Sequence, residues 1–490
     1  MRRAAALATP ARGEQLPSMS RRAPAAILAP GEDGVPPVPA AARPRGRVAA
    51  LPRTVRVGLL GLGTVGTGVL AVLASNRADI ERKTGRQIEI ARVLVRDAGK
   101  PRGAVVPPHL LTTDPEDVLG DPGIGIVVEV MGGTGEALAH TLRALRAGKS
   151  VVTANKDVMA EHGREVWAAA EAGGADVYFE ASVGGGIPIV RALKESLAGN
   201  SVRRVAGILN GTTNYILTRM TESGATLEDA LAQAQAQGYA EADPRADVDG
   251  LDAARKLCIL SSIAYSARCR PAEVFIQGIR EVAPADIAHA AGMGWTIKLL
   301  AISELREGRV SMRVHPTFVP RSHPLAAVND TFNAIYVQGD AIGDAMFYGR
   351  GAGSLPTASA VLGDLIEAAR RHGNGERATA CTCFHRRPFD RIGTIVSRFY
   401  VRLVVPDRVG VLAKIAGVFG RAGVSILSVQ QAPSPEHPGA GARPAEELAE
   451  LIIVTHAVRE DRLQRAMEGL HRLEAVVGIG SVLRLAPEDL

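Results

Sequence analysis

A glycine-rich turn between a strand-like and a helix-like segment constrains this chain more than any other feature. Residues 56–60 form a strand-like run that leads directly into GLGTVG. In such a turn Gly61 permits a tight bend, Gly63 lets the backbone approach a pyrophosphate and Gly66 lets the next helix pack closely. The N-terminus of that helix supplies N–H groups and a favourable dipole for an anion. The motif therefore predicts a βαβ unit that holds a dinucleotide.

Strand-like and helix-like segments continue to alternate after this turn. Further strands are expected at residues 88–95, 124–130 and 150–153, each preceded by a helical or turn segment. This alternation predicts a parallel sheet with crossover connections. A strand at 176–180 then leads into ASVGGGIP and a second region of separated strands and long helices. That region predicts a substrate domain built on an antiparallel or mixed sheet.

The C-terminal part follows the order strand, helix, strand, strand, helix, strand, with strands at 448–455 and 479–485 and a helix at 459–471. This order is typical of a small ferredoxin-like domain. The predicted fold class is therefore α/β, with a Rossmann-type parallel-sheet domain, an α+β substrate and dimerisation domain, and a ferredoxin-like βαββαβ domain. The expected limits are a tail at 1–52, a nucleotide domain at 53–157, a catalytic domain at 158–371 whose end returns to the nucleotide domain, a linker at 372–397 and a C-terminal domain at 398–488.

The net charge of +6 is concentrated in the N-terminal tail. Residues 1–53 hold nine arginines and three acidic residues, so the remainder of the chain is close to neutral. No basic groove with interleaved aromatic residues is visible and no apolar run reaches the length of a membrane span, so neither nucleic acid nor a membrane is an expected partner. Residues 1–52 are expected to be disordered, either as a transit peptide or as a dispensable tail with Met19 as the true start.

The four cysteines are Cys258, Cys269, Cys381 and Cys383. Only the last two are close in sequence, and a single intervening residue is too short a spacing for the usual zinc site. They are expected to be reduced thiols in a reducing compartment, which points to a cytoplasmic protein.

The end of the second expected strand bears on the choice of cofactor. The acid that usually reads the ribose of NAD lies near this position. Here Arg96 occupies or adjoins it, with Lys100 and Arg102 just beyond. A guanidinium could pair with a 2′-phosphate, so NADP(H) is favoured over NAD(H). Asp97 could serve NADH instead, and Arg96 could be an ordinary solvated side chain.

An acidic run, GYAEADPRADVDGLDAARK at residues 238–256, is too rich in carboxylates for packing alone. Asp249 is expected to cap a helix, with Asp252 in its first turn where carboxylates are favourable. Lys256 follows on the same face, as part of a functional site or as an ordinary surface ion pair. Upstream, four carboxylates crowd into nine residues: Glu241, Asp243, Asp247 and Asp249. Because like charges repel, a substrate ammonium group would help to explain them.

Six motifs in this order resemble those of the homoserine dehydrogenases, in the long bacterial form with a C-terminal ACT regulatory domain. They are GLGTVG, VVTANK (151–156), FEASVGGGIP (179–188), ILNGTTNYIL (208–217), the acidic run and GRGAGSLPTASAV (349–361). The resemblance covers the chain from about Thr54 to its end, and no aspartate-kinase segment is visible in the sequence. It implies NAD(P)H-dependent interconversion of L-aspartate 4-semialdehyde and L-homoserine, in threonine, methionine and isoleucine biosynthesis.

The resemblance assigns catalytic and substrate roles by motif. Lys256 would exchange the proton of the substrate oxygen, with Asp252 beside it, and Lys156 would assist near the nicotinamide. A positioned ammonium both stabilises charge on that oxygen and donates the proton. Glu241 would hold the substrate amino group and Asp247 would help to shape that subsite. The implied substrate set is Gly238, Tyr239, Glu241, Asp247, Asp252 and Lys256.

The resemblance also assigns a cofactor set and a cation site. The implied cofactor set is Gly61, Gly63, Thr64, Val65, Gly66, Arg96, Thr134, Lys156 and Gly351. Glu180 and the carbonyl groups of Val183, Gly185 and Ile187 match a site for a monovalent cation, usually Na⁺, with a structural role. Without the resemblance, the same glycine-rich segment would suit a simple tight bend.

VPDRVGVLAKIAGVFGRAGVSI resembles the first strand, loop and helix of an ACT domain, a common amino-acid sensor. Asp407, Val409 and Gly410 lie in the loop where such domains often hold an effector, and the family implies L-threonine. A dimerisation device without ligand is the alternative, and a homodimer or homotetramer is expected. Two other functions stay open: a catalytically inactive sensor of NADP and an amino acid, and a dehydrogenase of another small semialdehyde.

Overall fold

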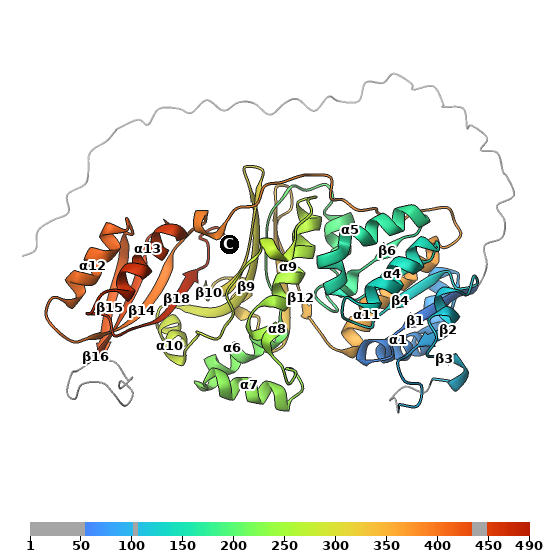
Figure 1. The fold of residues 1–490 in the computed structure, drawn as a ribbon, viewed down its shortest axis with the longest axis horizontal. Coiled ribbons are helices and arrows are strands. Elements are labelled where there is room, and N and C mark those ends of the chain that lie inside the picture. Colours follow the sequence, from blue (N-terminus) through green and yellow to red (C-terminus); the bar gives the residue numbers. More distant parts are fainter. Residues whose placement is uncertain (1–53, 101–105, 434–447) are drawn as a thin grey trace, which may run out of the picture. The chain divides into compact units, whose positions relative to one another are not determined.

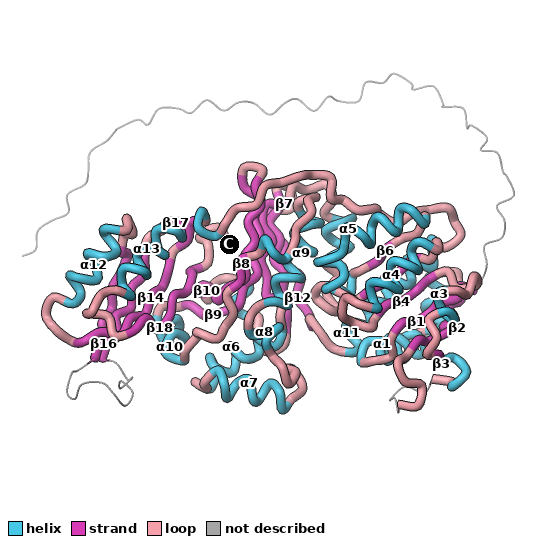
Figure 2. The backbone as a smooth tube through the Cα atoms, in the orientation of Figure 1, coloured by secondary structure: helices cyan, strands magenta, loops and turns pink. Residues whose placement is uncertain are grey.

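The computed structural model describes residues 54–100, 106–433 and 448–490. The predicted tail at residues 1–52 and Arg102 lie outside the described residues. Two large sheets organise the described chain. Figure 1 labels many of their strands, and Figure 2 colours helices and strands by type. In the part of the chain that the structure describes, no helix is long and apolar enough to cross a membrane.

The first sheet is parallel, with the strand order β3-β2-β1-β4-β5-β6. Its strands are β1 (Thr54–Leu60), β2 (Gln87–Leu94), β3 (Leu111–Thr112), β4 (Ile126–Glu129), β5 (Ser150–Thr153) and β6 (Val177–Tyr178). The predicted parallel sheet with crossovers is confirmed. The order reverses between β1 and β4, and in such sheets ligands bind at the carboxyl ends of the strands beside this point.

Helices cover both faces of this sheet. They are α1 (Thr64–Ser75), α2 (Arg77–Thr84), α3 (Glu116–Leu119), α4 (Glu136–Arg146), α5 (Lys156–Gly173) and α11 (Ser354–Arg371). α11 comes from much later in the chain and packs beside α1, where Ser354 Oγ donates to the Thr64 carbonyl at 2.7 Å. Leu59 shares one core with Leu365 of α11, whereas Leu60 belongs to the core on the other face. Burial on both faces explains the continuous apolar runs of these strands.

The second sheet is mixed, as predicted, with the path β12-β11-β7-β9-β10-β18-β14-β16-β15 and β8 paired to β10. Its strands before the C-terminal part are β7 (Val202–Ile208), β8 (Phe275–Ile276), β9 (Trp295–Arg306), β10 (Arg309–Pro320), β11 (Phe332–Gly339) and β12 (Gly343–Arg350). The helices of this part are α6 (Gly211–Ser223), α7 (Leu227–Ala236), α8 (Arg245–Val248), α9 (Leu251–Ala264) and α10 (Pro284–Gly292). α6 and α9 pack against β9, and α9 also contacts α5 of the first sheet.

The C-terminal part has the predicted βαββαβ order. Its elements are β14 (Phe399–Pro406), α12 (Val411–Arg421), β15 (Ile426–Pro433), β16 (Leu448–Thr455), α13 (Glu460–His471) and β18 (Gly478–Leu485), with a short pair β13 (Val396–Ser397) and β17 (Val458–Arg459). Short helical turns elsewhere are Pro108–Leu110, Glu180–Ser182, Ala192–Ser196, Pro271–Glu273, Pro324–Ala327 and Ile392–Thr394. β18 pairs in parallel with β10, so this part continues the second sheet.

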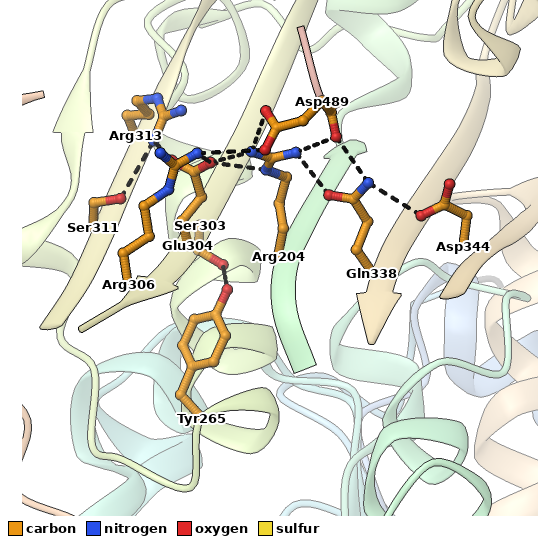
Figure 3. A network of polar contacts seen from close by, with 10 residues as sticks. All are labelled: Arg204, Tyr265, Ser303, Glu304, Arg306, Ser311, Arg313, Gln338, Asp344 and Asp489. Carbon is orange, nitrogen blue, oxygen red and sulfur yellow. Dashed lines mark hydrogen bonds and ion pairs between the residues drawn. The ribbon is translucent and has the colours of Figure 1, made fainter. Parts of the chain in front are cut away.

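A charged cluster crosses β7, β9 and β10 and holds the C-terminal residues, as Figure 3 shows. Arg204 donates to Glu304 at 2.6 and 2.8 Å, and Arg313 donates to the other carboxylate oxygen at 2.9 Å. Burial alone would raise the pKa of Glu304, but Arg313 and Arg204 outweigh it and hold that pKa at about 2. Arg204 and Gln338 also donate to Asp489, at 2.8 and 2.9 Å.

A second buried cluster joins α10 to the C-terminal strands. The Asp286 carboxylate is fully buried and accepts hydrogen bonds from Tyr400 at 3.0 Å, Arg402 at 2.8 Å and Ser481 at 2.6 Å. Arg402 also donates to Glu450 at 3.0 Å. Removing one partner of such a buried, hydrogen-bonded charge costs about 3–5 kcal/mol. The cluster therefore ties the C-terminal part firmly to the catalytic part.

Candidate active site

The glycine-rich turn lies at the carboxyl end of β1. Gly61 has φ +100°, which a residue with a side chain rarely adopts, and a Cβ on Gly66 would clash with the Gly61 carbonyl oxygen. Gly63 caps α1 and faces open space, and Thr64 and Val65 begin the helix. A cavity of about 770 Å³ opens beside this turn. Its lining includes Gly61, Gly63, Arg96, Asp97 and Lys100.

Two polar residues fix the loops at the carboxyl ends of β4 and β5. The buried Glu129 accepts hydrogen bonds from the Met131 N–H and the Thr153 hydroxyl, and burial raises its pKa. Asn155 caps α5 through its side-chain oxygen and donates to the Gly133 carbonyl at 2.8 Å. These bonds hold the MGGT loop, which contains the half-buried Thr134, beside the first residue of α5, Lys156.

Asp252 brings the two predicted catalytic lysines together. Lys256 Nζ donates to Asp252 Oδ2 at 2.6 Å and to the Leu209 carbonyl at 2.8 Å. Lys156 Nζ lies 3.4 Å from the other oxygen, Asp252 Oδ1. Lys156 comes from a helix of the first sheet and the other two from α9, so this carboxylate joins the two parts of the chain.

The ionised forms of Asp252 and Lys156 stabilise each other in this cluster. Burial by itself would raise the pKa of Asp252, but Lys256, Lys156 and the hydrogen bonds to the carboxylate outweigh it and hold the pKa at about 2. Burial would lower the pKa of Lys156, but the charges of Asp252 and Asp157 raise it overall. At neutral pH Asp252 is therefore a carboxylate and Lys156 is an ammonium group.

Asn210, which the sequence did not single out, joins this cluster. Its side-chain oxygen caps α6, and its amide donates to Asp247 at 2.6 Å and to Asp252 at 2.9 Å. Burial raises the pKa of Asp247, and the Asn210 hydrogen bond works against this. The residue lies in ILNGTTNYIL, where an asparagine before a helix signals a cap but says nothing of its two distant partners.

The structure corrects the predicted start of α9. Gly250, with φ +82°, precedes the first helical residue, whereas Asp249 follows α8 and pairs with Arg280. A Cβ on Gly250 would lie 3.1 Å from Ile276 and 3.2 Å from Val314, so β8 and β10 leave little room for a side chain, and the positive φ also favours glycine. Tight packing of this turn against the sheet therefore decides the cap.

Partners from within the chain also account for much of the acidic run. Asp243 pairs with Arg245, Asp249 with Arg280, and Asp247 accepts from Asn210. The argument that these carboxylates need a cationic ligand is therefore weaker than the sequence suggested. Arg245 lies inside the run itself, and Arg280 is distant in sequence.

The first residues of the run form a turn beside the start of α6. Gly238 has φ +74°, and the Tyr239 carbonyl accepts from Thr212 at 2.7 Å. The Tyr239 ring lies 5.1 Å from that of Tyr215. Glu241 is exposed, and its carbonyl accepts from Gln235. The structure thus places this turn beside Thr212, two residues after Asn210.

The segment with the predicted cation site is a compact buried loop. The Glu180 carboxylate accepts from the backbone N–H groups of Val190 and Arg191, both at 2.8 Å. Gly185 has φ +55° and approaches the backbone of Gly351, and Val183 and Ile187 are buried nearby. Among the described residues, no group of three His, Cys, Asp or Glu side chains could hold a metal ion.

The loop at Gly351 surrounds an unsatisfied side chain. Asn333 of β11 is fully buried, and neither its amide nitrogen nor its oxygen has a hydrogen-bond partner in the described structure. A Cβ on Gly351 would overlap this amide, and Gly211 at the start of α6 is also close. A buried polar group without a partner costs about 1–3 kcal/mol. Burying this amide is therefore a cost that the rest of the fold offsets.

The predicted effector loop precedes α12. Gln431 of β15 donates to Asp407 at 2.9 Å, Val409 is fully exposed, and Gly410 has φ +87° at the start of the helix. The structure thus brings the loop close to an edge strand of the second sheet.

Comparison with protein families gives a consistent assignment. The model of the homoserine dehydrogenase family matches residues 188–366, and the model of its NAD-binding domain matches residues 61–180. The ACT-domain model matches residues 399–475.

Individual relatives agree over most of the chain. A homoserine dehydrogenase of Synechocystis is 45% identical over 442 residues, which cover 88% of this chain and 99% of that one. The enzyme of Bacillus subtilis is 40% identical, and the match covers 88% and 98%. Among solved structures, the homoserine dehydrogenase from Thiobacillus denitrificans has a TM-score of 0.80 at 39% identity, over 88% and 98% of the two chains. A hyperthermophilic archaeal homoserine dehydrogenase in complex with NADPH has a TM-score of 0.55 at 29% identity, over 64% and 97%.

Proposed function

This chain belongs to the homoserine dehydrogenase family, and we propose that it interconverts L-aspartate 4-semialdehyde and L-homoserine with Lys256 as the residue that exchanges the proton. The observation that carries this assignment is the cluster of Lys256, Asp252 and Lys156, with distances of 2.6 and 3.4 Å. The enzyme class is an NAD(P)-dependent oxidoreductase acting on a CH–OH group.

Lys256 is well placed to act on a substrate oxygen. An ammonium group has three N–H donors. Two point at Asp252 and at the Leu209 carbonyl, which leaves the third for the substrate. When bound, the reduced nicotinamide supplies the hydride. Lys256 then stabilises the negative charge that develops on the aldehyde oxygen and transfers a proton to it.

Lys156 and Asp252 position this lysine. The Asp252 carboxylate anchors Lys256 in one orientation and remains ionised across the physiological pH range because its pKa is about 2. Lys156 balances the charge of that carboxylate and adds positive potential where the oxygen becomes negative. We place the substrate beside the turn of Gly238 and Tyr239, with Asp247 shaping the subsite and Glu241 holding the amino group.

The cavity beside the glycine turn fits a dinucleotide. Gly63 leaves the backbone open to a pyrophosphate, and the N-terminus of α1 faces that position. Arg96 and Lys100 line the same cavity and favour the extra phosphate of NADP(H) over NAD(H). Thr134 and Gly351 complete the proposed set.

A monovalent cation, such as Na⁺, fits the loop of Val183, Gly185 and Ile187. The Glu180 carboxylate already accepts two backbone N–H groups, so main-chain carbonyl oxygens are the better donors to an ion. Oxygen ligands suit such a hard cation. Its role is to hold this loop against Gly351, with no part in hydride transfer.

The remaining proposals concern regulation and setting. L-threonine is the proposed effector at Asp407, Val409 and Gly410, because the C-terminal part matches the ACT-domain family. A homodimer or homotetramer is the proposed assembly. A cytoplasmic location is proposed because all four cysteines are free thiols.

The decisive experiment follows NADPH absorbance with aspartate semialdehyde for the wild type, Lys256→Ala and Lys156→Ala, each with and without threonine. Loss of a general acid costs about 10²–10⁴-fold in rate, so Lys256→Ala should lose that much of kcat while NADPH still binds. Lys156→Ala should retain more activity, because Lys256 keeps its two other contacts. No turnover by folded, NADPH-bound wild type would refute the substrate and favour another semialdehyde or an inactive sensor.

A further inference from the structure

All four cysteines of the chain line one cavity, although they are far apart in sequence. Cys258 lies on α9, Cys269 follows that helix, and Cys381 and Cys383 lie in the segment after α11. The cavity has a volume of about 290 Å³ and is also lined by residues of α5. The backbone bridge between Ala267 and His385 holds the later segment in place. Folding therefore gathers thiols that no sequence spacing connects.

Two of these thiols are accessible and two are not. Cys258 and Cys269 are buried, whereas Cys381 and Cys383 are half-buried. Cys381 and Cys383 are hydrogen-bonded to each other through their side chains, and Arg268 and Lys194 lie near Cys381. Lys194 is fixed by a hydrogen bond to the Thr379 carbonyl at 2.9 Å. Two basic side chains thus line the same cavity as the two accessible thiols.

This environment gives the thiols different pKa values. The Cys383 hydrogen bond, together with Arg268 and Lys194, outweighs burial and lowers the pKa of Cys381 to about 6. Burial raises the pKa of Cys269 to about 12 and that of Cys258 well above its usual value. The thiolate is the reactive form of cysteine. Cys381 is also more accessible than Cys258 and Cys269 and shares its cavity with Arg268 and Lys194, so we expect it to react faster than the buried pair.

We propose that this cavity is a thiol-modification site, at which Cys381 reacts with a small, negatively charged disulfide and Cys383 resolves the product. The Cys381 thiolate attacks one sulfur of the disulfide, forms a mixed disulfide and releases one thiolate. Cys383 then gives its proton to water and attacks the Cys381 sulfur, which forms the Cys381–Cys383 disulfide and releases the second thiolate; the two released thiolates take up protons from water. Two electrons pass from the two cysteines to the small disulfide, which leaves as two thiols. Arg268 and Lys194 select for carboxylate-bearing disulfides.

The position of the cavity couples this chemistry to the proposed active site, and this part rests on the proposed function. The cavity lies between α5 and α9, the helices that carry Lys156 and Lys256. Arg255 of α9 pairs with Asp157 and Glu161 of α5, at 3.3 and 3.1 Å. A substituent on Cys381, or a change in the conformation of its segment on disulfide formation, alters the packing between these helices, because that segment lines the cavity with both of them. The 3.4 Å contact between Lys156 and Asp252 depends on their spacing.

The first test treats the reduced full chain with glutathione disulfide and maps the products by mass spectrometry. The wild type should form the Cys381–Cys383 disulfide, Cys383→Ser should stop at a mixed disulfide on Cys381, and Cys381→Ser should form neither. Arg268→Gln should slow the first step without changing the product. Adducts on Cys258 or Cys269 with Cys381 unmodified would overturn the proposal.

A second test measures the rate at which the uncharged reagent iodoacetamide alkylates Cys381 as a function of pH. The rate should reach half its maximum near pH 6, whereas an ordinary thiol does so near pH ~8.5. A midpoint near that of an ordinary thiol would refute the activated nucleophile. This result does not depend on any enzymatic activity, so it stands apart from a failure of the proposed function.

A third test measures dehydrogenase activity during oxidation. Activity should fall in proportion to the fraction of Cys381–Cys383 disulfide, return on reduction with dithiothreitol, and stay constant in Cys381→Ser. Full activity in a completely oxidised wild type would overturn the coupling to the active site.

Discussion

Asn210 holds together two carboxylates that would otherwise repel each other, and Asn210→Ser tests whether this sets the geometry of the site. The side chain donates to Asp247 and Asp252 at 2.6 and 2.9 Å and caps α6 through its oxygen. Serine keeps an oxygen that can cap the helix but has no amide to donate twice. The substitution therefore removes the link between the carboxylates and retains the cap.

The expected magnitude follows from these two bonds. A hydrogen bond to a charged group contributes about 1.5–3 kcal/mol, and water replaces part of it when the donor is lost. A net loss of about 2–4 kcal/mol in transition-state stabilisation corresponds to a fall in kcat/KM of roughly 30- to 700-fold. Serine and asparagine cap helices about equally well. The unfolding temperature should therefore change little.

Steady-state kinetics with NADPH and aspartate semialdehyde measure the effect. Thr226→Ala is the matched control, because Thr226 caps the exposed helix α7 and touches none of the site residues. Its loss should cost about 1 kcal/mol of stability and leave kcat/KM unchanged. Wild-type kcat/KM in Asn210→Ser, or an equal loss in Thr226→Ala, would refute the reasoning.

Three further predictions follow from the structure. The pKa of Glu304 is about 2 in the folded protein and ~4.3 in the unfolded chain. Its ionisation therefore contributes roughly 3 kcal/mol of stability above pH ~4.3, which is lost as the pH falls towards 2. Measured by circular dichroism, Glu304→Gln should have a lower unfolding temperature than wild type at pH 7, and the difference between the two should disappear on acidification. Gly351→Ala would place a Cβ on the Asn333 amide and should lower kcat/KM about 10²-fold. Gly363→Ala is the control, because a Cβ there meets open space on α11 and should leave kcat/KM unchanged. Equal kinetics of the two variants would argue against a tight loop. Gln277→Leu removes the contacts to β18. If threonine inhibits the enzyme as proposed, this variant should weaken that inhibition without changing basal activity, and an unchanged inhibition curve would exclude Gln277 from the coupling.

Local patterns in the sequence were enough to predict much of the fold. The glycine turn and the alternation after it predicted a parallel sheet, and the C-terminal order predicted a βαββαβ unit; both are present. Asp252 and Lys256 could be placed on one helix face because a four-residue spacing is a local property. These successes share one cause, which is that short-range spacing and backbone preference decide them.

Contacts between distant segments account for what the sequence did not predict. Asp249 has the chemistry of a helix cap, but packing against β8 and β10 moves that role to Gly250. Asn210 caps a helix as its type suggests, yet its bonds to the two carboxylates depend on how α6 and α8 meet. The cysteine cavity likewise arises because the segment after α11 returns to α9. None of these follows from residue type or spacing.

The proposed active site is assembled from two helices that pack against different sheets. α5 supplies Lys156 and α9 supplies Asp252 and Lys256, and one 3.4 Å contact spans them. Displacements of about 1 Å in such a site cost around 10²-fold in rate, so we expect activity to depend on the spacing of these helices. The cysteine cavity lies in the same interface. Gln277 contacts Arg484 of β18, and two residues later the Ile279 N–H donates to the Val248 carbonyl, just ahead of α9. Oxidation of the thiols and binding of an effector would therefore act on one variable, the position of α9 against α5.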